Sequence, residues 1–150
     1  MGISEKSTTF ATPEPAKPLN DAQMCGSFYF FARIKKAIAR RFGLHVAPFE
    51  SWLTIVTLTR NSCCHHARVW NKQNTIRPML PNHITGNWIT LPTDTLRIYF
   101  DLCIIKYFLN TISPNNDMKS KIDALLSDFP EIDTAAMGMP QGWEDEPLWL

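Results

Sequence analysis

The sequence of 150 residues predicts an all-α fold, a helical bundle of about four helices. Apolar residues recur at roughly helical spacing in four separate segments, and Gly, Pro or Asn residues interrupt the chain between them. The length is that of one domain, and an apolar fraction of 45% is enough to build a core. We expect a mobile leader rich in Pro, Ser and Thr over residues 1–22 and one helical domain over residues 23–150.

The first predicted helix runs from Cys25 to Phe42, and Gly43 is expected to end it as a C-cap. One side of this helix carries an apolar stripe and another side is basic. The basic side can contact phosphate, but on charge alone we favour a solvated face. The stripe consists of Phe31, Ile34, Ile38 and Phe42, and the basic side of Arg33, Lys36 and Arg40, with Lys35 and Arg41 nearby.

The second predicted helix runs from about Phe49 to about Lys72. Pro48 suits the first turn of a helix, and Glu50 favours its positive end. Because no Gly or Pro interrupts the chain from Glu50 to Ile76, nothing in the sequence marks an earlier end.

The rest of the chain predicts a loop, two further helices and a tail. The loop covers Lys72 to Leu91, after which Thr93 or Thr95 can cap a helix that runs to about Thr111. That third helix has a broad apolar face, so we expect it at the centre of the core. A fourth helix is expected from Asp117 to Phe129. In the acidic tail after Glu131, we expect Trp143 and Trp149 to dock on the helices.

Charge and composition narrow the class of protein. Residues 1–80 carry eleven Lys/Arg and four Asp/Glu, net +7, whereas residues 81–150 carry four and ten, net −6. A basic half suits a polyanion as partner. No apolar run is long enough to cross a membrane, and residues 1–19 lack the apolar stretch of a signal peptide. We therefore expect a cytoplasmic protein with reduced cysteines and no membrane partner.

Groups that can handle a phosphate gather between Arg60 and Asn71, in the run Arg-Asn-Ser-Cys-Cys-His-His-Ala-Arg-Val-Trp-Asn. Asn61 and His65 are four residues apart and share a helix face. Arg60 and His65 are five apart, which turns them about 140° from each other on a straight helix. Either the helix breaks between them, or a second copy of the chain completes the site across a two-fold axis.

This run resembles the Arg-(4 to 6 residues)-His signature of HEPN-superfamily ribonucleases, and its longer pattern resembles their Abi-like, or abortive infection, branch. Further pieces of the chain are similar to that branch in the same order, so the resemblance covers about Cys25 to Leu150. Members of that branch are about twice this length, so the expected fold is a HEPN-like bundle truncated at its N-terminal side. The further pieces are Lys35–Leu44, Ser51–Leu53, Met137–Pro140, Trp143 and Pro147–Trp149.

The resemblance implies metal-independent cleavage of RNA by a site that often forms across a homodimer. His65 would move protons, since histidine titrates near neutral pH, and Arg60 would stabilise charge on phosphorus. Asn61 would orient the imidazole or contact phosphate, while His66 and Arg68 would bind the substrate. Such a toxin can also have an antitoxin or regulatory partner. We expect no cofactor and no metal.

Four alternatives stay open at this point. Arg60, Asn61 and His65 can instead be buried and satisfy one another by hydrogen bonds. A zinc site at Cys63-Cys64-His65-His66 is disfavoured, because four consecutive helical residues point in four directions. Cys63 or Cys64 as a nucleophile lacks a partnered third group, so buried packing is the better interpretation for both thiols. Finally, the chain can be a non-catalytic remnant or an interaction module.

Overall fold

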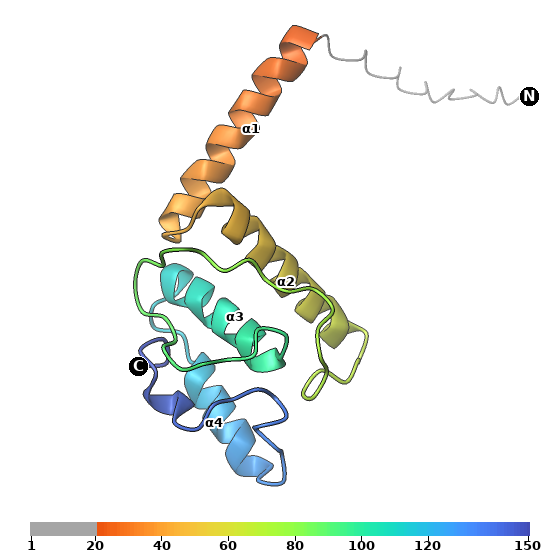
Figure 1. Ribbon diagram of the computed structural model, residues 1–150, viewed down its shortest axis with the longest axis vertical. Coiled ribbons are helices and arrows are strands. Elements are labelled where there is room, and N and C mark those ends of the chain that lie inside the picture. The colour runs from red at the N-terminus through yellow and green to blue at the C-terminus, as the bar shows by residue number, and fades with distance from the viewer. Residues whose placement is uncertain (1–20) are drawn as a thin grey trace, which may run out of the picture.

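The computed structural model describes residues 21–150, and over these residues the fold is all-α, as predicted. The described part of the chain contains no strand. The predicted leader lies outside the described residues as far as Asn20. Figure 1 shows the four α-helices, which are α1 (Asp21–Arg41), α2 (Val46–Cys64), α3 (Ile98–Ile112) and α4 (Met118–Asp128), with the short 3-10 helix η1 (Trp143–Asp145) near the C-terminus.

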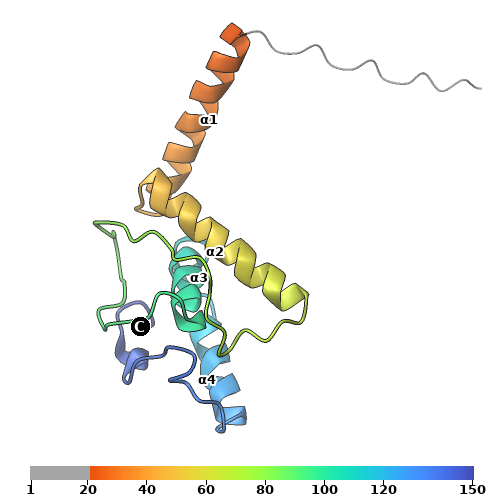
Figure 2. The same ribbon diagram turned by 45° about the vertical axis from the view of Figure 1, so that its right-hand side comes forward.

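Helix α1 projects away from the other helices and meets them only at its C-terminal end (Figures 1 and 2). Gly43, with φ of 65°, ends it as predicted: the Gly43 N–H donates to Arg40 and the Leu44 N–H to Ala39. These two bonds form a Schellman motif, which needs a residue in the left-handed region. Because α1 projects, most of its predicted apolar stripe is exposed, and only Phe42 packs partly against the core.

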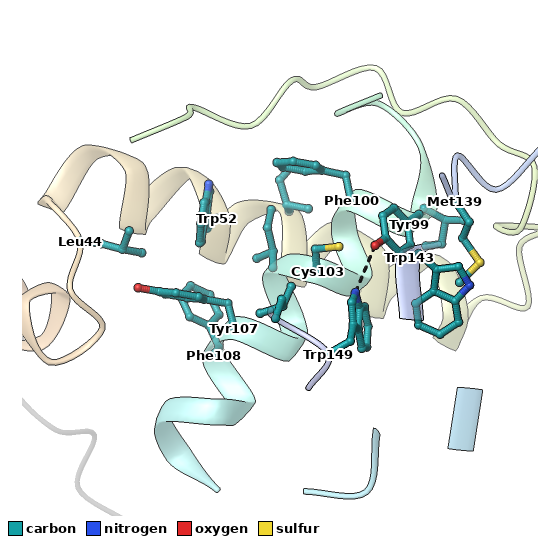
Figure 3. Packing of buried hydrophobic residues seen from close by; sticks show 14 of the residues in the cluster. Leu44, Trp52, Tyr99, Phe100, Cys103, Tyr107, Phe108, Met139, Trp143 and Trp149 are labelled. Atoms are coloured by element: carbon teal, nitrogen blue, oxygen red, sulfur yellow. Dashed lines mark hydrogen bonds between the residues drawn. The ribbon is translucent and has the colours of Figure 1, made fainter. Parts of the chain in front are cut away.

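The core forms where α2 crosses α3. Its largest part is aromatic, and Figure 3 shows these side chains converging on α3. Helix α3 is buried on the face that its periodicity predicts, and Tyr99, Cys103 and Ile104 are all fully buried. On one side of the core, Trp52 of α2 stacks on Trp88 of the long loop with ring centroids 4.9 Å apart.

The long loop after α2, which includes residues 72–91, lies against α2. Hydrogen bonds to α2 fix the path of this loop, which has no regular secondary structure. The Trp52 indole N–H donates to the Met79 carbonyl oxygen at 2.9 Å, and the Met79 N–H donates to the Ser51 hydroxyl oxygen at 2.9 Å. The predicted loop at Lys72–Leu91 is thus confirmed.

Four predicted helix limits are wrong. Helix α1 begins at Asp21 rather than Cys25, so the last two residues of the predicted leader are helical, and α2 begins at Val46 rather than about Phe49.

Helix α3 begins at Ile98 with Arg97 as N-cap, so neither Thr93 nor Thr95 caps it. The reason is a turn before the helix, in which the Leu96 N–H donates to the Asp94 carboxylate and the Arg97 N–H to the Asp94 carbonyl oxygen.

Helix α2 ends at Cys64, eight residues before the predicted limit at Lys72. All of its buried residues lie between Pro48 and Ile55, so its last turns extend past the core. Without burial of an apolar face, little stabilises a longer helix there.

The tail docks on the helices as predicted. Trp143 and Trp149 are both buried, their rings meet edge to face at 5.2 Å, and the Trp149 indole N–H donates to the Tyr99 hydroxyl oxygen (Figure 3). The buried Glu146 carboxylate accepts the backbone N–H groups of Thr90 and Leu91, which ties the tail to the long loop. Helix α4 lies within one residue of its predicted ends and is mostly exposed, with no buried residue.

None of the helices in residues 21–150 has both the length and the apolar character that crossing a membrane requires.

Candidate functional site

The C-terminal end of α2 falls inside the predicted motif, between Arg60 and His65. His65 is the C-cap, and His66 adopts φ of 51° in the left-handed region. The His66 N–H donates to Cys63 and the Ala67 N–H to Ser62, the same pair of bonds that ends α1. A histidine therefore occupies the position that Gly usually fills in a Schellman motif. The helix therefore ends within the motif, one residue before His65.

The predicted catalytic residues lie on the surface of this helix end. Arg60 and His65 are exposed and Asn61 is half-buried. The Arg60 Nη1 donates to the Asn61 Oδ1 at 3.0 Å, so the first two residues of the motif are held together. Since Arg60 and His65 are not buried, the alternative of a buried, self-satisfied network is wrong for these two residues.

The predicted substrate-binding residues, His66 and Arg68, follow the end of α2. His66 and Arg68 are both exposed, and the Arg68 guanidinium lies over the Trp70 ring, 5.0 Å from its centroid. This cation–π contact fixes the direction of Arg68 but leaves its N–H groups open to an anion. Over residues 21–150, no hydrogen bond or ion pair joins Arg60 to His65, or either of them to Arg68.

A buried carboxylate beside the motif is a residue that sequence reasoning missed. Asp101 of α3 is 1% exposed, and its Oδ2 accepts the Thr59 hydroxyl at 2.8 Å and the Asn74 amide at 2.9 Å. Its Oδ1 has no hydrogen-bond partner among the described residues. Burial raises the pKa of this carboxyl, and the two hydrogen bonds oppose that rise.

One feature of the sequence indicates that Asp101 is a buried polar residue. Asp101 interrupts the apolar run from Ile98 to Leu109, at a position between residues that face the core. A charged residue on a core face is expected to be paired or hydrogen-bonded, and therefore to mark a polar contact inside the fold.

A small cavity of about 100 Å³ lies next to this carboxylate, between the end of α2 and the long loop. Thr59 and Ser62 flank Arg60 and Asn61 in the sequence, so the wall of the cavity and the motif share one helical turn. The polar residues that line it are Thr59, Ser62, Lys72, Asn74, Thr75 and Asp101.

The cysteines of the motif are exposed, which corrects the expectation that they pack in the interior. They lie in the last turn of α2, beyond the part of the helix that the core covers. In the part of the chain that the structure describes, no three His, Cys, Asp or Glu side chains lie close enough together to hold a metal ion.

Comparison with known proteins gives a match to a family model, and this match includes the motif. No curated protein and no solved structure matches the chain. Residues 22–71 match the family described as Abi-like protein, and this range contains all of α1 but its first residue, the whole of α2 and the run from Arg60 to Asn71. The C-terminal pieces of the predicted resemblance, from Met137 to Trp149, lie outside that match. The Abi-like resemblance predicted from the sequence is thus confirmed for residues 22–71, a third of the chain, which are similar to that family.

Proposed function

We propose that this protein is a cytoplasmic, metal-independent endoribonuclease of the abortive-infection type, with a HEPN-type site at Arg60, Asn61 and His65. The observation that carries the proposal is the pairing of an Abi-like segment with an exposed Arg60-Asn61-x-x-x-His65 motif. Exposure matters because a phosphodiester must reach the guanidinium and the imidazole directly.

The chemistry follows from the groups that RNA supplies. Each 2′-hydroxyl can attack the adjacent phosphodiester, breaking the bond to the 5′-oxygen and forming a 2′,3′-cyclic phosphate. His65 would take the proton of the hydroxyl or return one to the leaving oxygen. Arg60, held against Asn61, would present its planar fork to the phosphate oxygens, where negative charge builds up in the transition state.

The test is cleavage of several single-stranded RNAs in the presence of EDTA. We expect products that end in a 2′,3′-cyclic phosphate, and no cleavage of DNA of the same sequence, because DNA lacks the attacking hydroxyl. His65→Ala should lower the rate by about 10² to 10⁴ and Arg60→Ala by about 10² to 10³.

A surface variant serves as the control for a contaminating nuclease. Lys121→Ala removes an exposed cation on α4 that pairs with Asp117 and lies outside the motif, and it should cleave like the parent. Equal cleavage by the parent and His65→Ala would show that the activity belongs to another protein.

A second candidate is a non-catalytic interaction module, and one observation favours it. Helix α1 leaves Tyr29, Phe30 and Phe31 mostly exposed, with Phe31 60% exposed. A cluster of exposed aromatic residues is typical of a binding surface. A folded parent that cleaves none of the RNAs would favour this module over the enzyme.

A further inference from the structure

An open cleft of about 680 Å³ lies at the opposite end of α2 from the motif. Lys36 and Arg40 of α1 line one side, His45 lies at the start of α2, and His83 of the long loop lines another side. His45 and His65 are twenty residues apart along α2, so at the rise of an α-helix the two regions are separated by about 30 Å. The cleft is therefore distinct from the proposed catalytic site.

Buried contacts hold the walls of this cleft in place. The Tyr107 hydroxyl lies 2.7 Å from the Phe42 carbonyl oxygen and 2.8 Å from the Thr85 carbonyl oxygen, so it can donate to either wall. Gly43 lies so close to Thr85 that a Cβ at Gly43 would come within 2.6 Å of the Thr85 Cβ. The end of α1 and the long loop therefore meet at a fixed distance.

The charged side chains that line the cleft are all positive. All four of its ionisable side chains are basic or can become cationic, and no carboxylate lines it. Lys36 and Arg40 form no ion pair with any residue in the described range, whereas the neighbouring Lys35 pairs with Glu50 at 2.7 Å. The start of α2 adds to this field through the backbone N–H groups of Val46 and Ala47, because His45 makes no side-chain cap and the first N–H groups of a helix have no intrahelical partner; Pro48, the next residue, has no N–H.

We propose that this cleft, lined by Lys36, Arg40, His45 and His83, is a second anion site that binds the phosphate groups of a nucleotide or of a nucleic-acid strand. Its volume lies within the range of small-ligand sites, about 300–1,000 Å³. Arg40 offers a fork for two phosphate oxygens, and Lys36 a compact point charge. The proposal concerns binding alone and does not depend on cleavage at the motif.

The test measures the binding of a fluorescent single-stranded DNA oligonucleotide, which cannot be cleaved through a 2′-hydroxyl, over a range of salt concentrations. Arg40→Glu is compared with Arg41→Glu, which makes the same charge change on the next residue of α1 but lies outside the cleft. For single strands the log–log dependence on salt has a slope of about −0.7 per phosphate contact. Arg40→Glu should lower the affinity about tenfold or more and reduce that slope by about 0.7, whereas Arg41→Glu should change the affinity less than about threefold.

A second variant keeps the proposal open to contradiction if Arg40→Glu fails to fold by circular dichroism. His83→Gln changes only an exposed loop residue that lines the cleft, so it should weaken oligonucleotide binding, and an unchanged affinity would contradict the site. Equal losses in Arg40→Glu and Arg41→Glu, or no measurable binding by the parent, would overturn the proposal.

A competition arm separates the two sources of phosphate. Displacement of the oligonucleotide by a nucleoside triphosphate, lost in Arg40→Glu, supports a free nucleotide as ligand. Resistance to the triphosphate, together with affinity that rises with oligonucleotide length, supports the backbone of a nucleic acid. Triphosphate displacement that is identical in the parent and Arg40→Glu contradicts a site at this cleft.

Discussion

Asp101 is the residue that links the candidate catalytic end of α2 to the core. Its carboxylate reaches Thr59 on α2 and Asn74 on the loop from a buried position on α3. Three segments far apart in the sequence thus share one carboxylate. A buried acceptor oxygen without a partner costs free energy, and that cost is greatest when the carboxylate is charged.

The first prediction concerns this carboxyl and pH. Burial raises the pKa of Asp101 above its ordinary value of 3.8, so the folded protein holds the proton more tightly than the unfolded chain. The stability that the carboxyl contributes is therefore complete below that value and is lost as the pH rises through the folded-state pKa. Asp101→Asn cannot titrate. The stability of the parent relative to this variant should therefore be greatest at acidic pH and should decrease towards pH 7.

Thermal unfolding of both proteins at several pH values checks this prediction. A difference in melting temperature between parent and Asp101→Asn that stays constant with pH, or that moves in favour of the parent as the pH rises, would contradict it.

The second prediction concerns the left-handed residue at the end of α2. An L-residue in this region costs roughly 1–2 kcal/mol, and Gly avoids the cost but loses more entropy on folding. His66→Gly should therefore raise the free energy of unfolding by about 0.5–1 kcal/mol, measured by urea denaturation. His65→Gly is the matched control: His65 has φ of −92°, so Gly there should bring no gain. A loss of stability in His66→Gly would show that the histidine makes contacts that outweigh its strained backbone.

At the scale of elements, the long loop keeps its place because side chains replace the backbone bonds that a helix or strand would supply. Glu146 of the tail accepts two adjacent N–H groups of the loop, at Thr90 and Leu91. This carboxylate is 3% exposed, so its removal would take a buried charged acceptor from both N–H groups.

The third prediction follows from this contact. Glu146→Ala should lower the free energy of unfolding by about 1–3 kcal/mol, because the Thr90 and Leu91 N–H groups lose a charged acceptor. Glu144→Ala removes an equal charge two residues away at an exposed position and should change the stability by less than about 0.5 kcal/mol. Urea denaturation compares the two variants, and equal effects would mean that only the net charge of the tail matters.

At the scale of the whole molecule, the question is whether the proposed site is formed by one chain or by two. Arg60 lies on the helix and His65 at its cap, and no contact joins them in the described residues. A two-fold axis beside this helix end would bring the Arg60 of one copy to the His65 of the other, since an isologous interface presents the same patch twice.

The fourth prediction tests that shared site by mixing two inactive variants. In a heterodimer of Arg60→Ala and His65→Ala, one of the two sites would hold both native residues and the other neither. Mixing equal amounts, with half of the dimers heterodimeric, should then restore about a quarter of the parent activity. No recovery in a mixture that light scattering shows to exchange subunits would place each site within one chain.

The sequence predicts the helices well where burial and periodicity agree, and less well where they do not. The apolar face of α3 is a clear case, because Tyr99, Cys103 and Ile104 repeat at helical spacing and all three are buried. The apolar stripe of α1 has the same spacing, yet Phe31 is exposed. Periodicity shows which residues share a face, but what covers that face depends on tertiary contacts that spacing alone does not contain.

The same limit of sequence-based prediction applies to the candidate site, both where α2 ends and in the residues that pack beside the motif. The sequence around His66 contains no Gly or Pro, so the left-handed residue that ends α2 could not be recognised from residue types. The motif itself was found from its spacing, whereas Asp101 lies forty residues after Asn61 and joins the region only through folding. Contacts between such distant segments are the part of a site that a single sequence conceals.

Two pairs of tryptophan side chains lie in different parts of the core. Trp52 and Trp88 stack between α2 and the long loop, whereas Trp143 and Trp149 meet within the tail. Trp70 also emits, so each pair is followed by fluorescence in a variant in which Trp70 and both indoles of the other pair are replaced by phenylalanine. Coincident loss of both signals on denaturation would identify a single cooperative unit, and separate losses would identify two. The arrangement of the aromatic residues therefore provides the protein with built-in reporters of whether its loop and its tail unfold together.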